Sequence, residues 1–378
     1  MVKPIRLWAI ARKEFLHIIR DPRSLAMAIA IPMVQLLIYG YALTLDVDNV
    51  PMVVWDQSNS SISREFVSRF KGSGYFALRG HVDNYQAVEQ AIDFREALVA
   101  LIVPRDFAGK VESGRPAMVQ LIVDGSDSNT ATIAMGYAEA VAFTYSQDMI
   151  IRRTQRSGSR FPPLPIDFRP RVWFNADLQS RNYLIPGLIA VIMTVITALL
   201  TSLTVAREWE RGTMEQLIST PMKAHELVLG KLLPYFLIGM LDVLLAVLMG
   251  IFLFHVPLRG NVVLVFAMAA IFLVGLLSVG ILISIVTRSQ LLSSQIAMIV
   301  TYLPALLLSG LMFAIPNMPK PLQLITYVIP ARYFVALLKG IYLKGGGLEI
   351  LSNEAILLTL FGIATVVLAN LKFRKKLE

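Results

Sequence analysis

The chain has 378 residues, of which 56% are hydrophobic and 16% are charged, and its mean hydropathy is +0.63. Soluble domains carry about 25% charged residues, so this composition excludes an ordinary soluble globular protein. The chain contains no cysteine, which excludes disulfides, thiolate metal sites and cysteine nucleophiles.

Charge is distributed unevenly along the sequence. Residues 46–180 contain 14 Lys and Arg against 16 Asp and Glu, so the remainder carries a net charge of +11. The excess basic residues flank long apolar runs, which is the arrangement that orients membrane proteins. We therefore attribute the basic character to membrane topology and expect no nucleic-acid partner.

Residues 1–23 predict a cytoplasmic amphipathic helix. Apolar side chains recur at helical spacing over Pro4–Arg20, with Arg6, Arg12 and Lys13 among the basic residues between them. A basic amphipathic helix next to a span lies in the membrane interface, although an ordinary juxtamembrane anchor fits the same pattern. The charges ahead of the first apolar run argue against a cleaved signal peptide.

Six apolar runs are long enough to cross a bilayer, which takes about 20 residues. The predicted spans are 24–45, 182–206, 232–254, 261–287, 289–315 and 355–371. Basic residues cluster before the first span and in the tail at 372–378, so we expect both termini in the cytoplasm. The loop at 207–231 then faces the cytoplasm, and residues 46–181 lie on the opposite, outer side of the membrane.

Residues 46–181 predict a folded α/β or α+β domain rather than a linker, because strand and helix patterns alternate. We expect strands at 51–55, 97–103, 117–123 and 171–174, and helices at 61–70, 85–94 and 130–153. Ser128 or Asn129 is the expected N-cap of the last helix.

Residues 316–350 are predicted to form a re-entrant segment on the outer side of the membrane. The segment is apolar and aromatic but is broken by Pro330. We expect short helices that dip into the outer leaflet, with protein or a cavity satisfying their ends.

Motifs for catalysis or metal binding are missing from the sequence. No GxxxxGK[ST] motif occurs, so the chain has no phosphate cradle of its own. The four histidines are scattered over three compartments and cannot form one metal site. We expect no catalytic residue, no metal and no cofactor in this chain.

The 207–231 loop carries the most specific pattern in the chain. Acidic and basic residues alternate around apolar Trp209, Met214, Leu217 and Ile218. A short helix that begins at Thr213, with Gln216 three residues on, fits a capping box. Such a helix suits a protein contact with an aromatic anchor, while a solvated connector fits equally well.

Residues 205–221, VAREWERGTMEQLISTP, resemble the cytoplasmic loop of ABC-2 type permeases. Lys13-Glu14 ahead of an Arg-Asp-Pro, Leu308-Ser309-Gly310 and Ile329-Pro-Ala-Arg-Tyr-Phe match the same family. The likeness covers nearly the whole chain. It resembles most the bacterial drug-export branch, in which two related permeases work with one ATPase and a membrane-fusion adaptor.

The resemblance implies a polytopic α-helical membrane protein with six transmembrane helices, like the ABC-2 or type V exporters, and a periplasmic α/β domain between spans 1 and 2. The chain would sit in the bacterial inner membrane as the permease of an ATP-driven exporter of amphipathic drugs. It would dimerise with a second copy or a paralogue. A separate cytoplasmic ATPase would bind ATP and Mg, and an adaptor and an outer-membrane channel could join outside.

The resemblance also assigns roles to residues. Those of the ATPase-coupling helix are Arg207, Glu208, Trp209, Glu210, Arg211, Gly212, Thr213, Glu215 and Leu217. Those of the connector helix are Arg12, Lys13 and Glu14. The transport path would run along spans 2 and 5, and the residues considered for it are Asp242, Pro186, Pro304 and Arg332.

Three alternatives stay open at this point. One is an ABC exporter of lipid or glycolipid. Another is an ion-coupled carrier that uses Asp242, the one acid inside a predicted span; inverted repeats expected of such carriers are not visible. The third is a membrane-anchored sensor, for which six spans are more than needed. The sequence does not identify the substrate.

Overall fold

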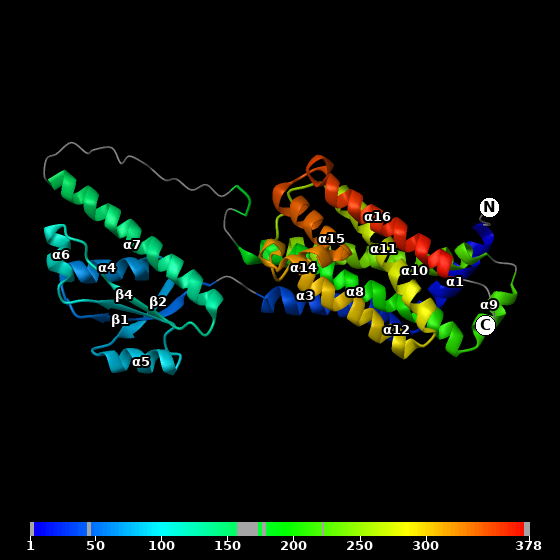
Figure 1. The fold of residues 1–378 in the computed structure, drawn as a ribbon, viewed down its shortest axis with the longest axis horizontal. Coiled ribbons are helices and arrows are strands. Elements are labelled where there is room, and N and C mark those ends of the chain that lie inside the picture. The colour runs from blue at the N-terminus through cyan, green and yellow to red at the C-terminus, as the bar shows by residue number, and fades with distance from the viewer. Residues whose placement is uncertain (1–3, 44–46, 157–172, 176–178, 221–222, 374–378) are drawn as a thin grey trace. The chain divides into compact units, whose positions relative to one another are not determined.

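A computed structural model of the chain describes residues 4–43, 47–156, 173–175, 179–220 and 223–373 (Figure 1). Two compact units emerge from it. The first, called here the membrane unit, combines Met1–Thr44 with Val172–Glu378, and the second, the α/β unit, is Leu45–Arg171. Each unit is described separately.

The membrane unit is entirely helical within the described residues. Its N-terminal part contains α1 (Pro4–Arg20), α2 (Pro22–Leu25), a π-helical turn (Ala26–Ala30) and α3 (Ile31–Ala42). Its central part contains α8 (Ser180–Glu210), α9 (Thr213–Ser219), α10 (Ala224–Leu248) with a π-helical end (Met249–Leu253), and α11 (Val262–Thr287). The remaining helices are α12 (Gln290–Ala297), a π-helical turn (Met298–Tyr302), α13 (Leu303–Leu308), a 3₁₀ turn (Ile315–Asn317), α14 (Lys320–Thr326), α15 (Pro330–Lys339) with a π-helical end (Gly340–Lys344), and α16 (Leu348–Lys372).

Five helical stretches of the described residues are long and apolar enough to cross a membrane. They are Ser180–Glu210, His225–Leu253, Val262–Thr287, Gln290–Leu308 and Leu348–Lys372. A sixth candidate is the pair Lys320–Thr326 and Pro330–Lys344, which is bent by 83° and corresponds to the expected re-entrant segment. The span predicted at 24–45 differs, because its apolar helix covers only Ala28–Ala42, which is shorter than the about 20 residues that a bilayer crossing takes.

Two further boundaries differ from the prediction. The fifth span, expected to reach residue 315, ends at Leu308 because Gly310 adopts a left-handed φ of 80° that breaks the helix. The last span, expected at 355–371, begins already at Leu348. Glu349 lies in the first turn of this helix, where its negative charge interacts favourably with the helix dipole.

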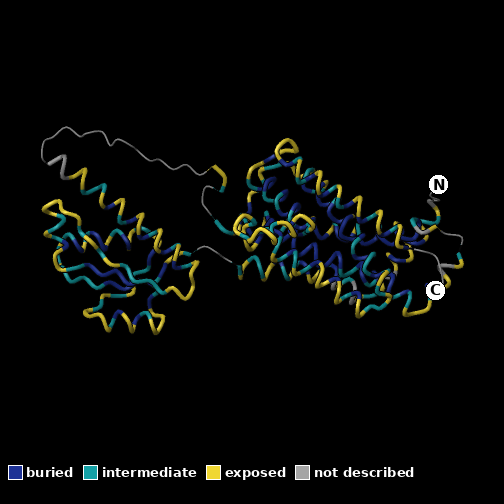
Figure 2. Tube along the Cα trace, in the orientation of Figure 1, coloured by how far each residue is buried: buried dark blue, intermediate teal, exposed yellow. Residues whose placement is uncertain are grey.

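Helix α8 is the centre of the membrane unit. Nearly all of its residues from Asn182 to Ala198 are buried, and Figure 2 shows this helix dark blue along most of its length. It contacts α3, α10, α11, α12 and α15. Small residues allow the closest of these approaches: a Cβ added at Gly280 of α11 would lie 2.0 Å from the Thr201 hydroxyl of α8.

The α/β unit contains a four-stranded sheet with helices on both faces (Figure 1). The strands β1 (Val50–Asp56), β2 (Phe76–His81), β3 (Val99–Val103) and β4 (Gln120–Val123) lie in the order β2-β1-β3-β4. β1 pairs in parallel with β2 and β3, and β4 runs antiparallel to β3.

Alternation along the strands gives the sheet two apolar faces. Val50, Met52 and Val54 of β1 pack with α4 (Ser61–Gly72), α6 (Phe107–Ser113) and α7 (Ser128–Arg156). Val53 points to the other face and packs with α5 (Tyr85–Asp93). The order of strands with helices on both faces follows from the two crossover connections.

Sequence patterns located three of these strands and missed β2. The missed segment, FALRGH, mixes polar and apolar residues and lies at a sheet edge. The strand expected at 171–174 is not seen: residues 173 and 174 are not in a strand, and the rest lies outside the described residues.

The N-cap of α7 is Asp127, and the expectation of Ser128 or Asn129 is wrong. Its carboxylate accepts hydrogen bonds from the Asn129 amide at 3.1 Å and from the Thr130 hydroxyl at 2.5 Å. These donors, the Thr130 hydroxyl first, lower the pKa of Asp127.

Candidate functional site

Helix α8 ends in a tight turn that leads directly into the short α9. Gly212 supplies this turn with a left-handed φ of 68°, and it is the residue that precedes α9. The sequence suggested Thr213 as the N-cap of α9, but the N-cap is Gly212. The Thr213 hydroxyl instead donates a hydrogen bond back to the Glu208 carboxylate.

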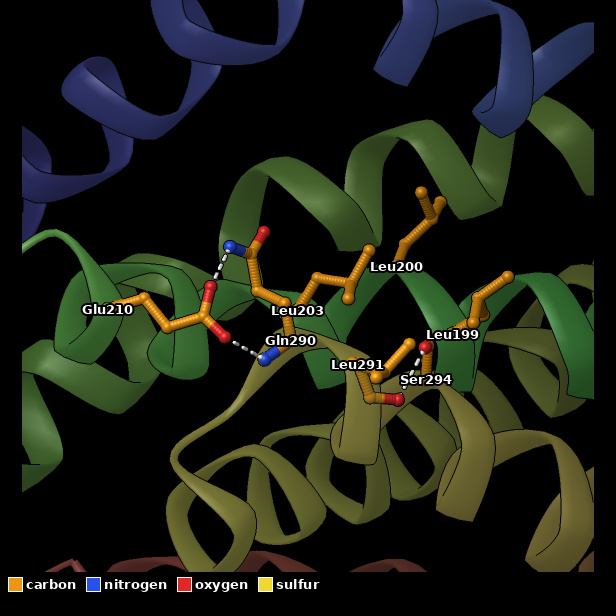
Figure 3. A pocket seen from close by; sticks show the side chains of 7 residues that line it. All are labelled: Leu199, Leu200, Leu203, Glu210, Gln290, Leu291 and Ser294. Atoms are coloured by element: carbon orange, nitrogen blue, oxygen red, sulfur yellow. Dashed lines mark hydrogen bonds between the residues drawn. The ribbon is translucent and has the colours of Figure 1, made fainter.

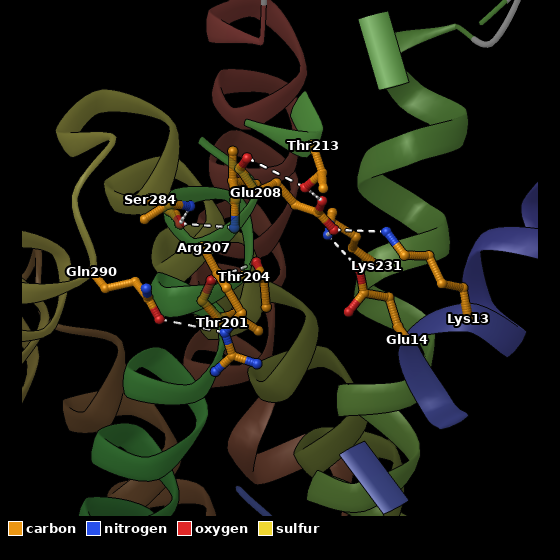
Figure 4. A network of polar contacts seen from close by, with 12 residues as sticks. Lys13, Glu14, Thr201, Thr204, Arg207, Glu208, Thr213, Lys231, Ser284 and Gln290 are labelled. Carbon is orange, nitrogen blue, oxygen red and sulfur yellow. Dashed lines mark hydrogen bonds and ion pairs between the residues drawn. The ribbon is translucent and has the colours of Figure 1, made fainter. Parts of the chain in front are cut away.

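Glu208 belongs to a group of four charged residues, called here the charge cluster: Lys13 and Glu14 of α1, Glu208 of α8 and Lys231 of α10 (Figure 4). Lys13 is exposed, and the other three are buried. The Lys231 ammonium donates to Glu14 and, at 3.3 Å, to Glu208. The Lys13 ammonium donates to the same Glu208 oxygen at 2.9 Å.

Burial makes this cluster a strong constraint on the helices that form it. Lys231 is 1% exposed, Glu14 7% and Glu208 9%. Two carboxylates and two ammonium groups balance one another. Because removing one partner of a buried pair costs about 3–5 kcal/mol, the cluster fixes α1, α8 and α10 at one point.

Helix α1 also crosses closely over α10 next to Lys231. A Cβ added at Gly230 would lie 2.8 Å from the Ile10 Cβ and 3.2 Å from the Leu7 carbonyl oxygen. One turn earlier, Glu226 of α10 forms an ion pair with Arg6 of α1 at 3.8 Å. Contacts along one face of α1 therefore hold it against α10.

A second set of contacts ties the end of α8 to α12. Glu210 accepts hydrogen bonds from the Gln290 backbone amide at 2.7 Å and from its side-chain amide. The Arg288 guanidinium lies 4.6 Å from the Trp209 ring centroid, where a cation–π contact forms. Trp209 also packs against the core of the membrane unit, so it is not a free anchor for a partner.

The outward-facing residues of the loop are fewer than the sequence suggested. Arg211, Gly212 and Glu215 are exposed, as is Arg12 of α1. Met214 is only 2% exposed and packs against its own chain. Arg207 is half-buried and contacts Gln290 at 3.4 Å, and the side chain of Leu217 lies outside the described part.

Cavities border this region on more than one side. One, of about 480 Å³, opens between α8 and α12 (Figure 3). Its lining residues are mainly leucines with a polar end: Leu199, Leu200, Leu203, Leu291, Ser294, Gln290 and Glu210. Another, of about 470 Å³, is lined by α1 and the loop, including Lys13 and Arg211. A smaller cavity of about 140 Å³ adjoins the charge cluster and is lined in part by Lys13, Glu208 and Thr213.

The four residues considered for a transport path lie on four helices. Pro186 is buried inside α8, and Pro304 is half-buried in α13. Asp242 of α10 is 2% exposed, and its Oδ1 has no hydrogen-bond partner among the described residues. Arg332 of α15 lies 3.9 Å over the Tyr327 ring and donates to the Thr326 hydroxyl.

No hydrogen bond or ion pair joins any two of these four in the part of the chain that the structure describes, and no group of three metal-ligating residues occurs there. Sequence reasoning missed two basic residues with structural partners, Lys231 and Lys339. The available signal was a lone lysine at the start of an apolar run for Lys231 and within an apolar run for Lys339.

The fold and the site define a multi-pass helical membrane protein in which a charged loop is tied into a helix bundle. Residues 22–371 match the model of the ABC-2 family transporter proteins, and the chain belongs to this family.

Relatives extend over nearly the full length of the chain. It is 37% identical over 383 residues to "Probable multidrug ABC transporter permease YbhS" of Escherichia coli (strain K12), covering 100% of each protein. It is 31% identical to "Probable multidrug ABC transporter permease YbhR" of the same strain, with 98% and 99% covered. It is 21% identical to "Linearmycin resistance permease protein LnrN" of Bacillus subtilis (strain 168), with 96% of each covered.

Proposed function

We propose that this chain is the permease subunit of an ATP-driven exporter that moves amphipathic small molecules out of the cytoplasm or the inner membrane. Family membership and the names of relatives at 37% and 31% identity support the export of drugs. ATP and Mg would bind to a separate cytoplasmic ATPase, because the sequence lacks the phosphate-binding motif.

The observation that carries this proposal is the charge cluster behind the α9 loop. Thr213, at the start of α9, donates a hydrogen bond to Glu208, and Glu208 binds Lys13 and Lys231. A displacement of α9 therefore moves charged groups that α1 and α10 share. Because buried ion pairs resist separation, the displacement reaches both helices together.

Exposed residues beside the cluster offer a surface for the ATPase. Arg211 and Glu215 on the loop and Arg12 on α1 present charges of both signs to solvent. Charges at an interface rim favour fast and selective association. We assign these three residues to ATPase docking, and we assign Glu208 and Lys231 to transmission within the permease.

The proposed transport path lies along α8 and the α12–α13 span, at a contact with a second permease copy or a paralogue. The leucine-lined cavity between α8 and α12 offers an apolar surface for an amphipathic cargo. The basic ends of the chain support a cytoplasmic location for both termini. In this proposal the α/β unit lies in the periplasm, where it could contact an adaptor and an outer-membrane channel.

Asp242 favours one rival function, an ion-coupled carrier. A buried carboxyl group with an unpartnered oxygen inside a span is a candidate site for proton or cation exchange. Export of lipid or glycolipid by the same ABC mechanism is the second rival, since a lipid is also amphipathic.

A pulldown in mild detergent tests the proposal. The wild-type protein should bring down an ATPase, and the eluate should hydrolyse ATP. Glu215→Lys combined with Arg211→Glu should lose the ATPase, whereas Glu349→Lys, an exposed charge reversal at the start of α16, should keep it. A monodisperse wild-type protein that brings down no ATPase would contradict the proposal and favour the carrier.

A further inference from the structure

The Lys339 side chain of α15 occupies an unusual setting in the membrane unit. Its ammonium group donates a hydrogen bond to the Gly310 carbonyl oxygen at 3.0 Å. The same nitrogen lies 3.4 Å from the centroid of the Tyr183 ring of α8. The residue is half-buried, so much of its charge is shielded from water.

No carboxylate forms an ion pair with Lys339 among the residues that the structure describes. The Gly310 carbonyl oxygen also accepts a hydrogen bond from the Tyr183 hydroxyl at 3.0 Å, so this acceptor is shared. An ammonium group has three donors, and a neutral carbonyl does not balance its charge. Within the described residues the Lys339 cation therefore has an aromatic ring and a shared carbonyl as partners but no anion, and a cation without a countercharge is costly away from water.

A second polar group without a partner precedes Gly310, the residue whose carbonyl oxygen binds Lys339. Ser309 is 2% exposed, and its hydroxyl makes no hydrogen bond within the described residues. It immediately precedes Gly310, whose φ of 80° turns the chain at the end of α13. Buried hydroxyl groups are ordinarily satisfied, so an unsatisfied one suggests a missing partner.

The surroundings of Lys339 are part of the proposed transport path. A Cβ added at Gly187 of α8 would lie 3.4 Å from the Lys339 Cε, so the lysine stem lies on α8 one residue beyond Pro186. Leu311 packs against the same glycine. α8, the end of α13 and α15 thus meet around one cation with apolar neighbours.

We propose that Lys339, with the Ser309 hydroxyl, binds the acidic headgroup of the exported amphiphile. The inference rests on the proposed export function and names its substrate class as a single-chain amphiphile with a carboxylate or phosphate group, as distinct from a two-chain phospholipid of the membrane. An anion would supply the missing countercharge and accept a hydrogen bond from Ser309. Charge-assisted hydrogen bonds of this kind are shorter and stronger than neutral ones.

A purely structural role for Lys339 makes a different prediction. If the lysine only clamps α15 to Tyr183, its removal should weaken every ligand of the permease equally. If it binds an anion, removal should affect acidic ligands alone. A matched pair of ligands that differ in one charge separates these roles.

The test uses the full-length protein in phosphatidylcholine nanodiscs without nucleotide. The probes are 11-(dansylamino)undecanoic acid and its uncharged methyl ester, with binding followed by dansyl fluorescence. Lys339→Met should weaken binding of the acid and leave the ester unchanged. Lys339→Arg should retain most of the acid binding, and Ser309→Ala should lose part of it.

Lys344→Met is the matched control, because it removes the same charge from an exposed position five residues further along. It should change neither probe. Equal loss of acid and ester in Lys339→Met, or no loss of either, would overturn the anion site. Lys339→Arg keeps the positive charge, and Ser309→Ala removes a single hydroxyl group. Misfolding of Lys339→Met alone therefore does not decide the result.

A further arm separates cargo from resident lipid. Phosphatidylglycerol added to the nanodiscs should not displace the acid probe from the wild-type protein. Displacement would show that a membrane lipid fills the site and would overturn the cargo assignment. Because no ATPase is present, failure of the ATPase pulldown leaves this readout intact, and the two proposals fail separately.

Discussion

Lys231 and Glu14 are 217 positions apart in the sequence and form a buried ion pair between α10 and α1. Glu208 joins this pair from the last turn of α8, next to the loop that carries α9. The contact is thus the point at which an exposed loop, an N-terminal amphipathic helix and two spans meet.

Replacing Lys231 should destabilise the protein strongly. Lys231→Met leaves two carboxylates without their shared partner, and loss of one member of a buried charge group costs about 3–5 kcal/mol. Thermal unfolding in detergent measures the change, with the exposed Lys320→Met as control. Adding Glu14→Gln to Lys231→Met should restore part of the stability; equal stability of all variants would contradict the account.

Glu208 and Glu210 should differ in effect although they lie two residues apart. Glu208→Gln should abolish transport while the ATPase still binds, because Glu208 is buried against Lys13 and Lys231 rather than exposed. Glu210→Gln keeps a side chain able to bond Gln290 and should transport nearly normally. ATPase pulldown and transport in proteoliposomes are the paired measurements. Loss of ATPase binding in Glu208→Gln would mean that this residue docks the partner directly.

A larger side chain at Gly230 should separate α1 from α10. Gly230→Val would place carbon against the Ile10 side chain and the Leu7 backbone, where space is already below contact distance. Overpacking of this kind costs about 1–3 kcal/mol. Crosslinking between α1 and α10 should fall along with the melting temperature. Gly250→Ala, whose new Cβ would meet Ile185 at an ordinary 3.5 Å, should change neither.

The first turn of α7 should lose stability in acid. The pKa of Asp127 is lowered from its usual 3.8, mainly by hydrogen bonds from Thr130, so ionised Asp127 stabilises the folded turn. This contribution is present above pH 3.8 and is lost as the pH falls through the lower folded value. Hydrogen exchange at Asn129 and Thr130, corrected for intrinsic rates, should show the loss in the wild type and not in Asp127→Asn. An identical pH profile in both would contradict the assignment.

Local patterns along the sequence predicted much of the membrane unit. Amphipathic spacing predicted the bounds of α1, and long apolar runs predicted the positions of α8, α10 and α11. The end of the fifth span was misplaced because the Ser309-Gly310 break depends on backbone conformation, which apolar composition does not reveal. β2 was missed because an edge strand needs no continuous apolar face.

The charge cluster could not be read from the sequence. Lys231 looked like the last residue of a solvated loop, and Glu208 looked like an exposed docking residue. Their pairing depends on the crossing of α1 over α10 at Gly230, a contact between segments more than 200 residues apart. The burial of Glu208 supports the role proposed for it above, an internal link between helices, over direct contact with the ATPase.

The measurement that tests the central claim most directly is a pair of spin-label distances in the assembled transporter. The chain has no cysteine, so labels at chosen positions report without background. Labels at Ala9 and Gln216, which are exposed and lie outside the residues assigned to ATPase docking, report on α1 against α9. Labels at Gln216 and Glu349 report on α9 against the start of α16. On ATP binding, the account predicts a constant first distance and a changed second one, with the first becoming variable in Lys231→Met. A first distance that changes in the wild type while the second stays fixed would contradict it.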